Sequence, residues 1–195
     1  MQKLIQEFFM ESIIPEIRGY INEQNKEETI KLVVGRANKD VMIGARYKNT
    51  KSSKNYCDNH SEYQKIVIKL IKDSKSISSR VLIKNMCNLT KELNIGLIQK
   101  LVNMSVKYLY AIQNCGVDFE LNFNIDEESC DCPLDSKILK HLEKDTNKKY
   151  TSWTKLEDID DYIQIQDDIH DVISSDIKYL GKSRLEYDFV NWCSS

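Results

Sequence analysis

The sequence lacks any apolar run that approaches the ~20 residues of a membrane-spanning helix. Its first residues, MQKLIQEFFMESII, also lack the apolar core of a signal peptide. This segment is amphipathic and mixed in charge, so it predicts a first helix instead of a targeting signal. No internal repeat or low-complexity linker divides the chain. We therefore expect a soluble, cytoplasmic protein that folds as one domain.

The chain also lacks a secretory context for its cysteines, which favours reduced thiols over a disulfide framework. Cys57-x-x-His60 supplies half of a zinc motif, and no matching second half lies nearby. Cys130 and Cys132 are too close in sequence for an easy disulfide or a standard zinc knuckle. We therefore expect small buried apolar side chains, with no metal and no cofactor. The six cysteines are Cys57, Cys87, Cys115, Cys130, Cys132 and Cys193.

What is present is an ordinary globular composition, with 41% hydrophobic and 30% charged residues in a chain of 195. A chain of this length can bury a sizeable core in one domain or in two small lobes. We predict a single helical domain over residues 1–195, with one lobe of about 1–76 joined by the C-terminal segment and another of about 77–150.

Charge is distributed unevenly along the chain. Residues 31–113 contain 16 Lys/Arg and 5 Asp/Glu, a balance of +11, whereas residues 156–176 contain eight Asp/Glu and no Lys/Arg. The basic half predicts a polyanionic partner, although a solvated lysine-rich face is the simpler alternative. Within it, RYKNTKSSK at 46–54 is predicted to be a mobile loop. The candidate DNA contacts there are Arg46, Lys48 and Lys51.

Hydrophobic periodicity predicts a mainly α protein. Residues 29–46 are ambiguous: a short β-hairpin and a helix–turn–helix are both compatible with two apolar runs around Gly-Arg-Ala-Asn-Lys-Asp. In the helix at 79–92 we expect Val81, Leu82, Met86 and Leu89 to point inward. The predicted helices are 1–24 with a kink at Pro15, 61–73, 79–92, 97–114, 133–144, 156–174 and 184–192.

One stretch, LNIGLIQKLVNMSVKYLY at 93–110, combines a turn at Asn94-Ile95-Gly96 with a helix that starts immediately after it. A glycine lets the backbone approach a partner closely, and free N–H groups at a helix start favour a phosphate. Lys100, Asn103 and Lys107 recur at helical spacing and are predicted to form one polar row. The alternative is the solvent-exposed edge of an amphipathic helix.

A second stretch, CPLDSKIL at 132–139, places Asp135 at the start of a predicted helix. One interpretation is an N-cap, in which the carboxylate accepts helix N–H groups. The same donors would also keep the carboxylate ionised and lower its pKa. A fixed carboxylate near a lysine suits N-glycosidic bond cleavage, since an anion stabilises the oxocarbenium character of the sugar and a lysine can form a Schiff base at C1′.

Together, NIGLIQKLVNMSVKYL and CPLDSKILKHL resemble the signature half of the helix-hairpin-helix DNA glycosylases. The chain is similar to their archaeal 8-oxoguanine and bacterial phage-defence types over about residues 77–192. The resemblance implies that Lys100 matches the hairpin lysine and Asp135 the catalytic aspartate. It departs from the family in having one hairpin glycine, Gly96, with Lys100 four positions later, and in lacking the frequent four-cysteine cluster, so no iron–sulfur cluster is expected.

A glycosylase must flip its base into a pocket, for which aromatic and amide side chains serve. Asn103, Tyr108 and Trp153 are the candidates, with Asn94, Gly96 and Lys107 as further DNA contacts beside the hairpin. Core packing is the alternative for each aromatic residue, including Tyr110 and Phe123. We expect His141 and His170 to be surface residues.

The sequence therefore predicts a DNA glycosylase that acts on double-stranded DNA with a modified or damaged base. The resemblance implies either a bulky viral pyrimidine, such as glucosylated hydroxymethylcytosine in anti-phage defence, or an oxidised purine in repair. AP-lyase activity depends on whether Lys100 is a nucleophile, a phosphate contact or a bystander. The alternative from another class is a non-enzymatic helical module that binds DNA or a protein, with Asp135 only as an N-cap.

Overall fold

The structure, a computed structural model, describes residues 1–12, 26–48, 50–115 and 122–192. It is mainly helical, as predicted, and within these ranges its only β pairing is an isolated bridge between Ile77 and Ile125. Pro15 and Cys193 lie outside the described residues. The helices are α1 (Gln2–Ser12), α3 (Lys26–Arg46), α4 (Lys51–Asp73), α5 (Ser79–Leu89), α6 (Ile95–Asn114), α7 (Ser136–Thr146), α8 (Ile159–Ser175) and α9 (Arg184–Trp192), with 3₁₀ turns η1 (Glu127–Ser129), η2 (Trp153–Lys155) and η3 (Ile177–Tyr179).

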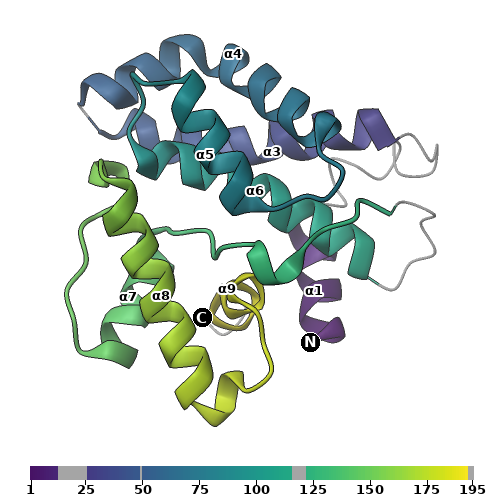
Figure 1. Ribbon diagram of the computed structural model, residues 1–195, viewed down its shortest axis with the longest axis vertical. Helices are drawn as coiled ribbons and strands as arrows, with labels where there is room; N and C mark the ends of the chain where they lie inside the picture. Colours follow the sequence, from purple (N-terminus) through teal and green to yellow (C-terminus); the bar gives the residue numbers. More distant parts are fainter. Residues whose placement is uncertain (13–25, 49, 116–121, 193–195) are drawn as a thin grey trace.

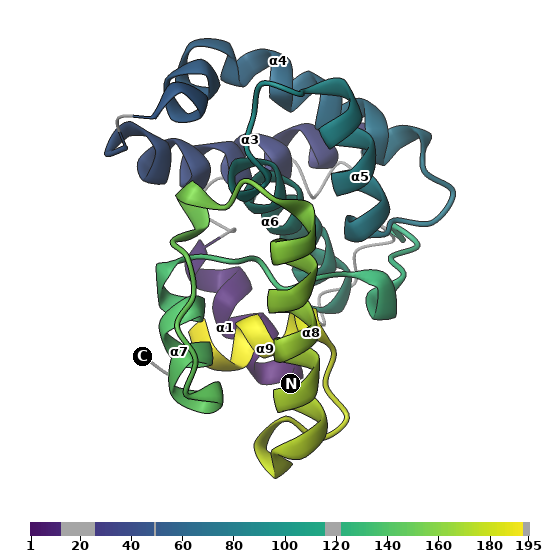
Figure 2. The same cartoon turned by 60° about the vertical axis from the view of Figure 1, so that its left-hand side comes forward.

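Helix α6 runs through the middle of the molecule and organises the other helices (Figure 1). Helices α3, α4 and α5 gather on one side of it, and α1, α7, α8 and α9 on the other (Figure 2). Every residue of α6 from Ile95 to Ile112 is buried, as expected of a helix enclosed all round. The predicted lobe boundary near residue 76 falls between α4 and α5, which pack on the same side of α6.

The predicted β-hairpin at 29–46 is wrong, because α3 continues without a break from Lys26 to Arg46. Its buried residues recur every three or four positions, as in Ile30, Val34, Ala37, Val41 and Ala45. A strand would alternate with a period of two, so this stripe faces α6 only in a helix. The apparent break at Gly-Arg-Ala-Asn-Lys-Asp is therefore part of the helix, with Ala37 and Asn38 buried and Lys39 exposed.

The predicted loop at 46–54 is shorter than expected. Helix α4 already begins at Lys51, where Thr50 is the N-cap and its side chain accepts a hydrogen bond from Ser53 N. In α5 two of the four residues predicted to point inward do not. Val81 and Leu89 are 54% and 62% exposed, whereas Leu82 and Met86 are buried as predicted, together with Ile83.

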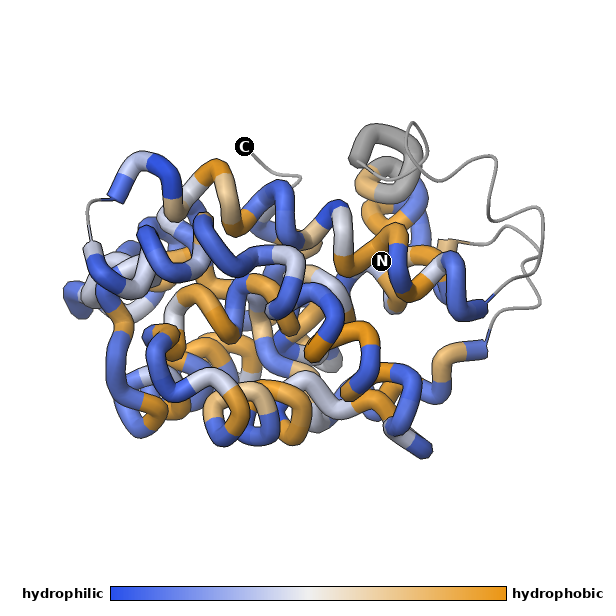
Figure 3. The backbone as a smooth tube through the Cα atoms, turned by 90° about the horizontal axis from the view of Figure 1, so that it is seen from above, coloured by the Kyte–Doolittle hydropathy of each residue, from blue (hydrophilic) through white to orange (hydrophobic). Residues whose placement is uncertain are grey.

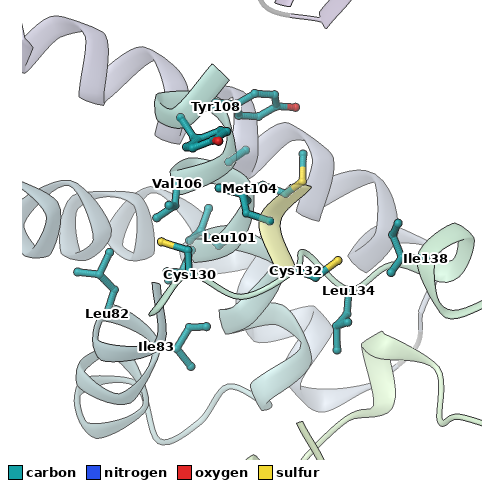
Figure 4. Packing of buried hydrophobic residues seen from close by; sticks show 14 of the residues in the cluster. Leu82, Ile83, Leu101, Met104, Val106, Tyr108, Cys130, Cys132, Leu134 and Ile138 are labelled. Carbon is teal, nitrogen blue, oxygen red and sulfur yellow. The ribbon is translucent and has the colours of Figure 1, made fainter. Parts of the chain in front are cut away.

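Apolar side chains from α5, α6 and segment 130–134 form the part of the core next to the N-terminus of α7. Figure 4 shows Cys130 and Cys132 on this segment, with Leu82 and Ile83 of α5 on one side. The cysteines act as small apolar side chains here, and burial raises the pKa of the Cys132 thiol well above its usual value. The five cysteines within the described ranges form no disulfide with one another.

Polar and apolar residues alternate along the helices (Figure 3). Among the described residues, no helix combines the length and apolar character that crossing a membrane requires.

Candidate active site

Asp135 caps the N-terminus of α7. It has extended backbone angles, and its Oδ1 accepts hydrogen bonds from Lys137 N and Ile138 N, both at 2.9 Å. The predicted N-cap role is therefore confirmed, and it stabilises a helix by about 1 kcal/mol. Helix α7 begins at Ser136 and not at Pro133, because the residues before the cap are extended.

The second carboxylate oxygen of Asp135 contacts Lys100. The distance from Lys100 Nζ to Oδ2 is 2.9 Å, and Lys100 is only 5% exposed. Burial would raise the pKa of Asp135, but the Lys100 ammonium and the N–H groups of Ile138 and Lys137 outweigh it, so the pKa lies below its usual value. The two residues predicted to act together thus form an ion pair, and Lys100 is not an exposed phosphate contact.

Two buried glutamines hold the segment that leads to Asp135. Gln99 Nε2 donates to Leu134 O at 3.0 Å, and Leu134 N donates to Gln99 Oε1 at 3.0 Å. Gln166 pairs with Cys132 in the same way, at 3.0 Å to its N and 2.8 Å to its O. Each side-chain amide therefore bonds both the N–H and the C=O of one backbone residue, as a neighbouring β-strand would. Sequence reasoning missed both glutamines, since nothing in their local context marks them.

Asp131 anchors the start of the same segment. Its carboxylate receives two bonds from Arg80, at 2.7 and 3.1 Å, and one from the Tyr162 hydroxyl at 2.9 Å. Burial and the adjacent Asp131 raise the pKa of Tyr162 well above its usual value, so the hydroxyl stays a donor. Buried hydrogen-bond networks of this kind restrict the conformation of the backbone. The geometry at Asp135 is consequently well fixed.

The Lys100–Asp135 pair forms part of the wall of a cavity of about 420 Å³. This volume is in the range of ~300–1,000 Å³ typical of small-molecule sites. Sequence reasoning missed most of its wall, which comes from helices distant in sequence. Its aromatic side chains are Phe8, Tyr108, Trp153 and Trp192, and its further charged ones are Arg36, Asp40, Lys107, Lys137 and Asp188.

Lys107, predicted as a DNA contact, is instead buried in an ion pair with Asp188 of α9. Its ammonium lies 4.1 Å from the ring centre of Phe8 and 4.9 Å from that of Phe189. Burial raises the pKa of Asp188 even though Lys107 opposes this shift. Lys107 is therefore not an exposed phosphate contact, because its ammonium lies between α1 and α9.

Of the predicted polar row, Lys100 and Lys107 line the cavity and Asn103 does not. Asn103 donates from Nδ2 to the Tyr162 hydroxyl at 3.0 Å. Met104 takes its place on the cavity wall between the two lysines. Because every face of α6 is buried, helical spacing alone did not show which neighbours each face meets.

The other two predicted pocket residues do line the cavity. Tyr108 donates its hydroxyl proton to Asp40 at 2.5 Å, and Arg36 holds the other oxygen of Asp40 at 3.2 Å. Trp153 packs its indole against Gly44, where a Cβ atom would lie 2.3 Å from the ring. Their role in binding a base stays a prediction.

The predicted phosphate-binding turn is occupied by the protein itself. Gly96 lies in the first turn of α6 and donates its N–H to Leu156 O at 3.0 Å. Asn94 is the N-cap, which accepts from Leu97 N at 3.1 Å and donates to Thr154 O at 2.8 Å. The expectation of free N–H groups at this helix start was therefore wrong, because the segment around η2 covers them.

The remaining candidates divide by exposure. Arg46, Lys48 and Lys51 are exposed, so their predicted contact with DNA stays open. Tyr110 and Phe123 are buried core residues. His170 is exposed as expected, whereas His141 is half-buried.

In the described part of the chain, no three His, Cys, Asp or Glu residues are grouped so as to hold a metal ion. No protein-family model, curated protein or solved structure matches the chain.

Proposed function

We propose that the protein is a DNA glycosylase that takes a modified or damaged base, flipped out of double-stranded DNA, into the cavity beside Asp135. The observation that carries this proposal is the Lys100–Asp135 ion pair on the cavity wall, with a 2.9 Å contact and a lysine only 5% exposed.

Capping α7 does not explain this pair. The cap uses Oδ1 of Asp135, whereas Lys100 binds Oδ2. Removing an ammonium group from water is unfavourable, and the attraction to one carboxylate often fails to offset it. Charged groups kept in a cleft despite this penalty are typical of sites that carry out chemistry.

The lowered pKa of Asp135 keeps its carboxylate ionised at neutral pH. As the bond from C1′ to the base breaks, the base leaves with the bonding electron pair and the sugar gains oxocarbenium character. The fixed carboxylate stabilises that positive charge. Water then adds to C1′, one of its protons goes to the departing base, and an abasic site remains.

Lys100 offers a second route. The departing base takes a proton from the Lys100 ammonium, and the neutral amine then bonds to C1′. Opening of the sugar ring converts this adduct into a Schiff base, from which strand cleavage can follow. The two routes differ in whether the enzyme is ever covalently attached to DNA.

The cavity supplies what a flipped base needs. Tyr108, Trp153 and Trp192 offer aromatic surfaces, and stacking of a base on such a side chain contributes ~1–3 kcal/mol. Lys107 and Asp188 provide buried polar groups that, in the described residues, have no hydrogen-bond partner beyond each other. A base that satisfied them would be distinguished from one that did not.

The experiment is to incubate the protein with phage DNA that contains glucosylated hydroxymethylcytosine and, separately, with duplexes that contain oxidised purines. We expect a free base, identified by mass, from one class of substrate. If no base leaves any modified or damaged DNA while the protein still binds duplex, the non-enzymatic binding module is the correct description.

Borohydride trapping separates the two routes. A covalent adduct with wild-type protein that disappears in Lys100→Ala supports the Schiff-base route, and one that persists in Lys100→Ala rules out Lys100 as the nucleophile. Lys65→Ala is the matched control, since Lys65 is an exposed lysine on α4 and does not line the cavity.

A further inference from the structure

A second hollow, of about 770 Å³, lies between α3 and α4. Its lining contains Lys31, Arg36, Lys39, Arg46 and His60 and, in the described part of the chain, no Asp or Glu. Lys31 pairs with Glu27 and Glu28, and Arg36 pairs with Asp40. These carboxylates are not among the lining residues, so the described groove wall itself contributes cations and no carboxylate.

The polar side chains in the groove are held in a defined orientation. Tyr56 donates its hydroxyl proton to Asn38 Oδ1 at 2.8 Å, which turns Asn38 Nδ2 toward His60 Nδ1 at 3.3 Å. Gln64 Nε2 approaches the same ring nitrogen at 3.3 Å. Because two amide donors meet Nδ1, this nitrogen accepts, and the ring hydrogen is on Nε2. His60 is thus a hydrogen-bond donor in its neutral form.

The groove adjoins the cavity. Arg36 and Ile43 line both, and Ile43 is 60% exposed. Arg36 Nε is buried with no hydrogen-bond partner among the described residues. A ligand in the groove therefore passes directly beside the cavity mouth.

We infer that this groove, and not the start of α6, holds the phosphate backbone of the DNA strand beside the flipped nucleotide. The inference rests on the proposed function, and it gives that function the phosphate site that the covered N-terminus of α6 cannot supply. Cations and neutral donors without carboxylates are the groups that bind phosphate oxygens.

The spacing of Lys39 and Arg46, two of the exposed cations on α3, fits a nucleic-acid strand better than a compact anion. Lys39 and Arg46 are seven residues apart, which is about 10 Å along a helix axis. Three nucleotides of one DNA strand rise by about the same distance. An acidic peptide is the competing partner, and the test includes it.

The test measures equilibrium binding of the full chain to a fluorescently labelled, unmodified duplex by anisotropy across a salt series. The groove variant is Lys39→Gln/Arg46→Gln. We expect its Kd to rise about tenfold at low salt, and the slope of log K against log salt to fall by about 1.8, since each lost phosphate contact removes about 0.9.

The matched control is Lys65→Gln/Lys69→Gln. It removes the same charge from α4, where both lysines are exposed and neither lines the groove. We expect its Kd and salt slope to equal those of the wild type. Thermal unfolding of both variants checks that the fold is kept.

Three results would overturn the inference: equal weakening by both double variants, wild-type binding by the groove variant, or groove-dependent binding of polyglutamate in place of DNA. Base release separates this inference from the proposed function. A protein that releases a base but binds DNA independently of the groove refutes the groove alone, and one that binds through the groove but releases no base refutes the glycosylase alone.

Discussion

Two helix N-termini in this molecule have the same local chemistry and opposite surroundings. Asn94 caps α6 and Asp135 caps α7, and each side chain accepts N–H groups from the first turn of its helix. At α6, the segment around η2 covers the helix start, and its carbonyl oxygens accept hydrogen bonds from Gly96 N and Asn94 Nδ2. At α7, the cap borders a cavity and faces Lys100.

The difference shows that a cap motif predicts where a helix begins and not whether a ligand can reach it. A covered N-terminus contributes stability, whereas an open one with a cation beside it can contribute chemistry. The following variants test this contrast, from the largest expected effect to the smallest.

Asp135→Asn should give the largest effect. Asn caps a helix nearly as well as Asp, so we expect the fold to be kept. Loss of the anion should slow base release about a thousandfold, as removal of a single group that stabilises transition-state charge does. Single-turnover base release measures this, with circular dichroism to confirm the fold.

Asn94→Asp is the matched exchange at the covered N-terminus. It keeps a cap and should leave base release within about twofold of the wild type. A large loss of activity in this variant, or none in Asp135→Asn, would contradict the assignment of chemistry to α7.

Gly96→Ala tests how tightly α6 is covered. A Cβ atom at Gly96 would lie 1.6 Å from the backbone oxygen of Trp153, so that segment must move. We expect a loss of about 3 kcal/mol in the free energy of unfolding, measured with urea. Gly35→Ala is the control, because its Cβ would approach only Gln64 Oε1, at 3.9 Å. We expect this variant to be no less stable than the wild type, since alanine is more favourable than glycine in a helix by ~1 kcal/mol.

Asn94→Ala should have a smaller effect. It removes the cap and the hydrogen bond to Thr154 O, and we expect a loss of about 2 kcal/mol in the free energy of unfolding. Base release per folded molecule should not change. Asn94→Ser keeps a capping oxygen and loses only the bond to Thr154, so about half of the loss should return. Equal losses in Asn94→Ala and Asn94→Ser would mean that the cap contributes nothing.

The pH dependence of stability should show the smallest effect. The pKa of Asp135 in the folded protein lies below the ordinary value of 3.8, so its ionised form stabilises the fold above that pH. As the pH falls through the lowered pKa, this contribution is lost. We therefore expect the difference in unfolding free energy between wild type and Asp135→Asn to be constant from pH 7 to pH 5 and to shrink below pH 3.8. A difference that already shrinks above pH 5 would contradict the lowered pKa.

Much of the helical layout is visible in the sequence because it depends on local pattern. The helices at 97–114, 156–174 and 184–192 were predicted within three residues of α6, α8 and α9, since periodic apolar residues and caps mark them. Helix α3 was not predicted as one helix, because Gly35 and the polar residues after it resemble a turn. Only packing of the Ile30–Ala45 stripe on α6 shows that the helix continues.

The candidate site was predictable in four of its residues, Lys100, Asp135, Tyr108 and Trp153, which all line the cavity. Lys100 and Asp135 stand in recognisable local settings, and the structure brings them together. Asp188, Trp192 and Arg36 came from helices whose sequences give no sign of a cavity. Asn103 and Lys107 were expected on an accessible polar row, but the helix is buried on every side and their neighbours come from distant segments.

The sequence by itself determined the helical class, most helix positions and the cap at Asp135, because these depend on residues within a few positions of each other. The tertiary structure decided which cap is covered and which borders a cavity, which face of α6 meets α9, and which cations line a groove. These outcomes depend on which distant segments pack together, and local sequence patterns do not predict that packing.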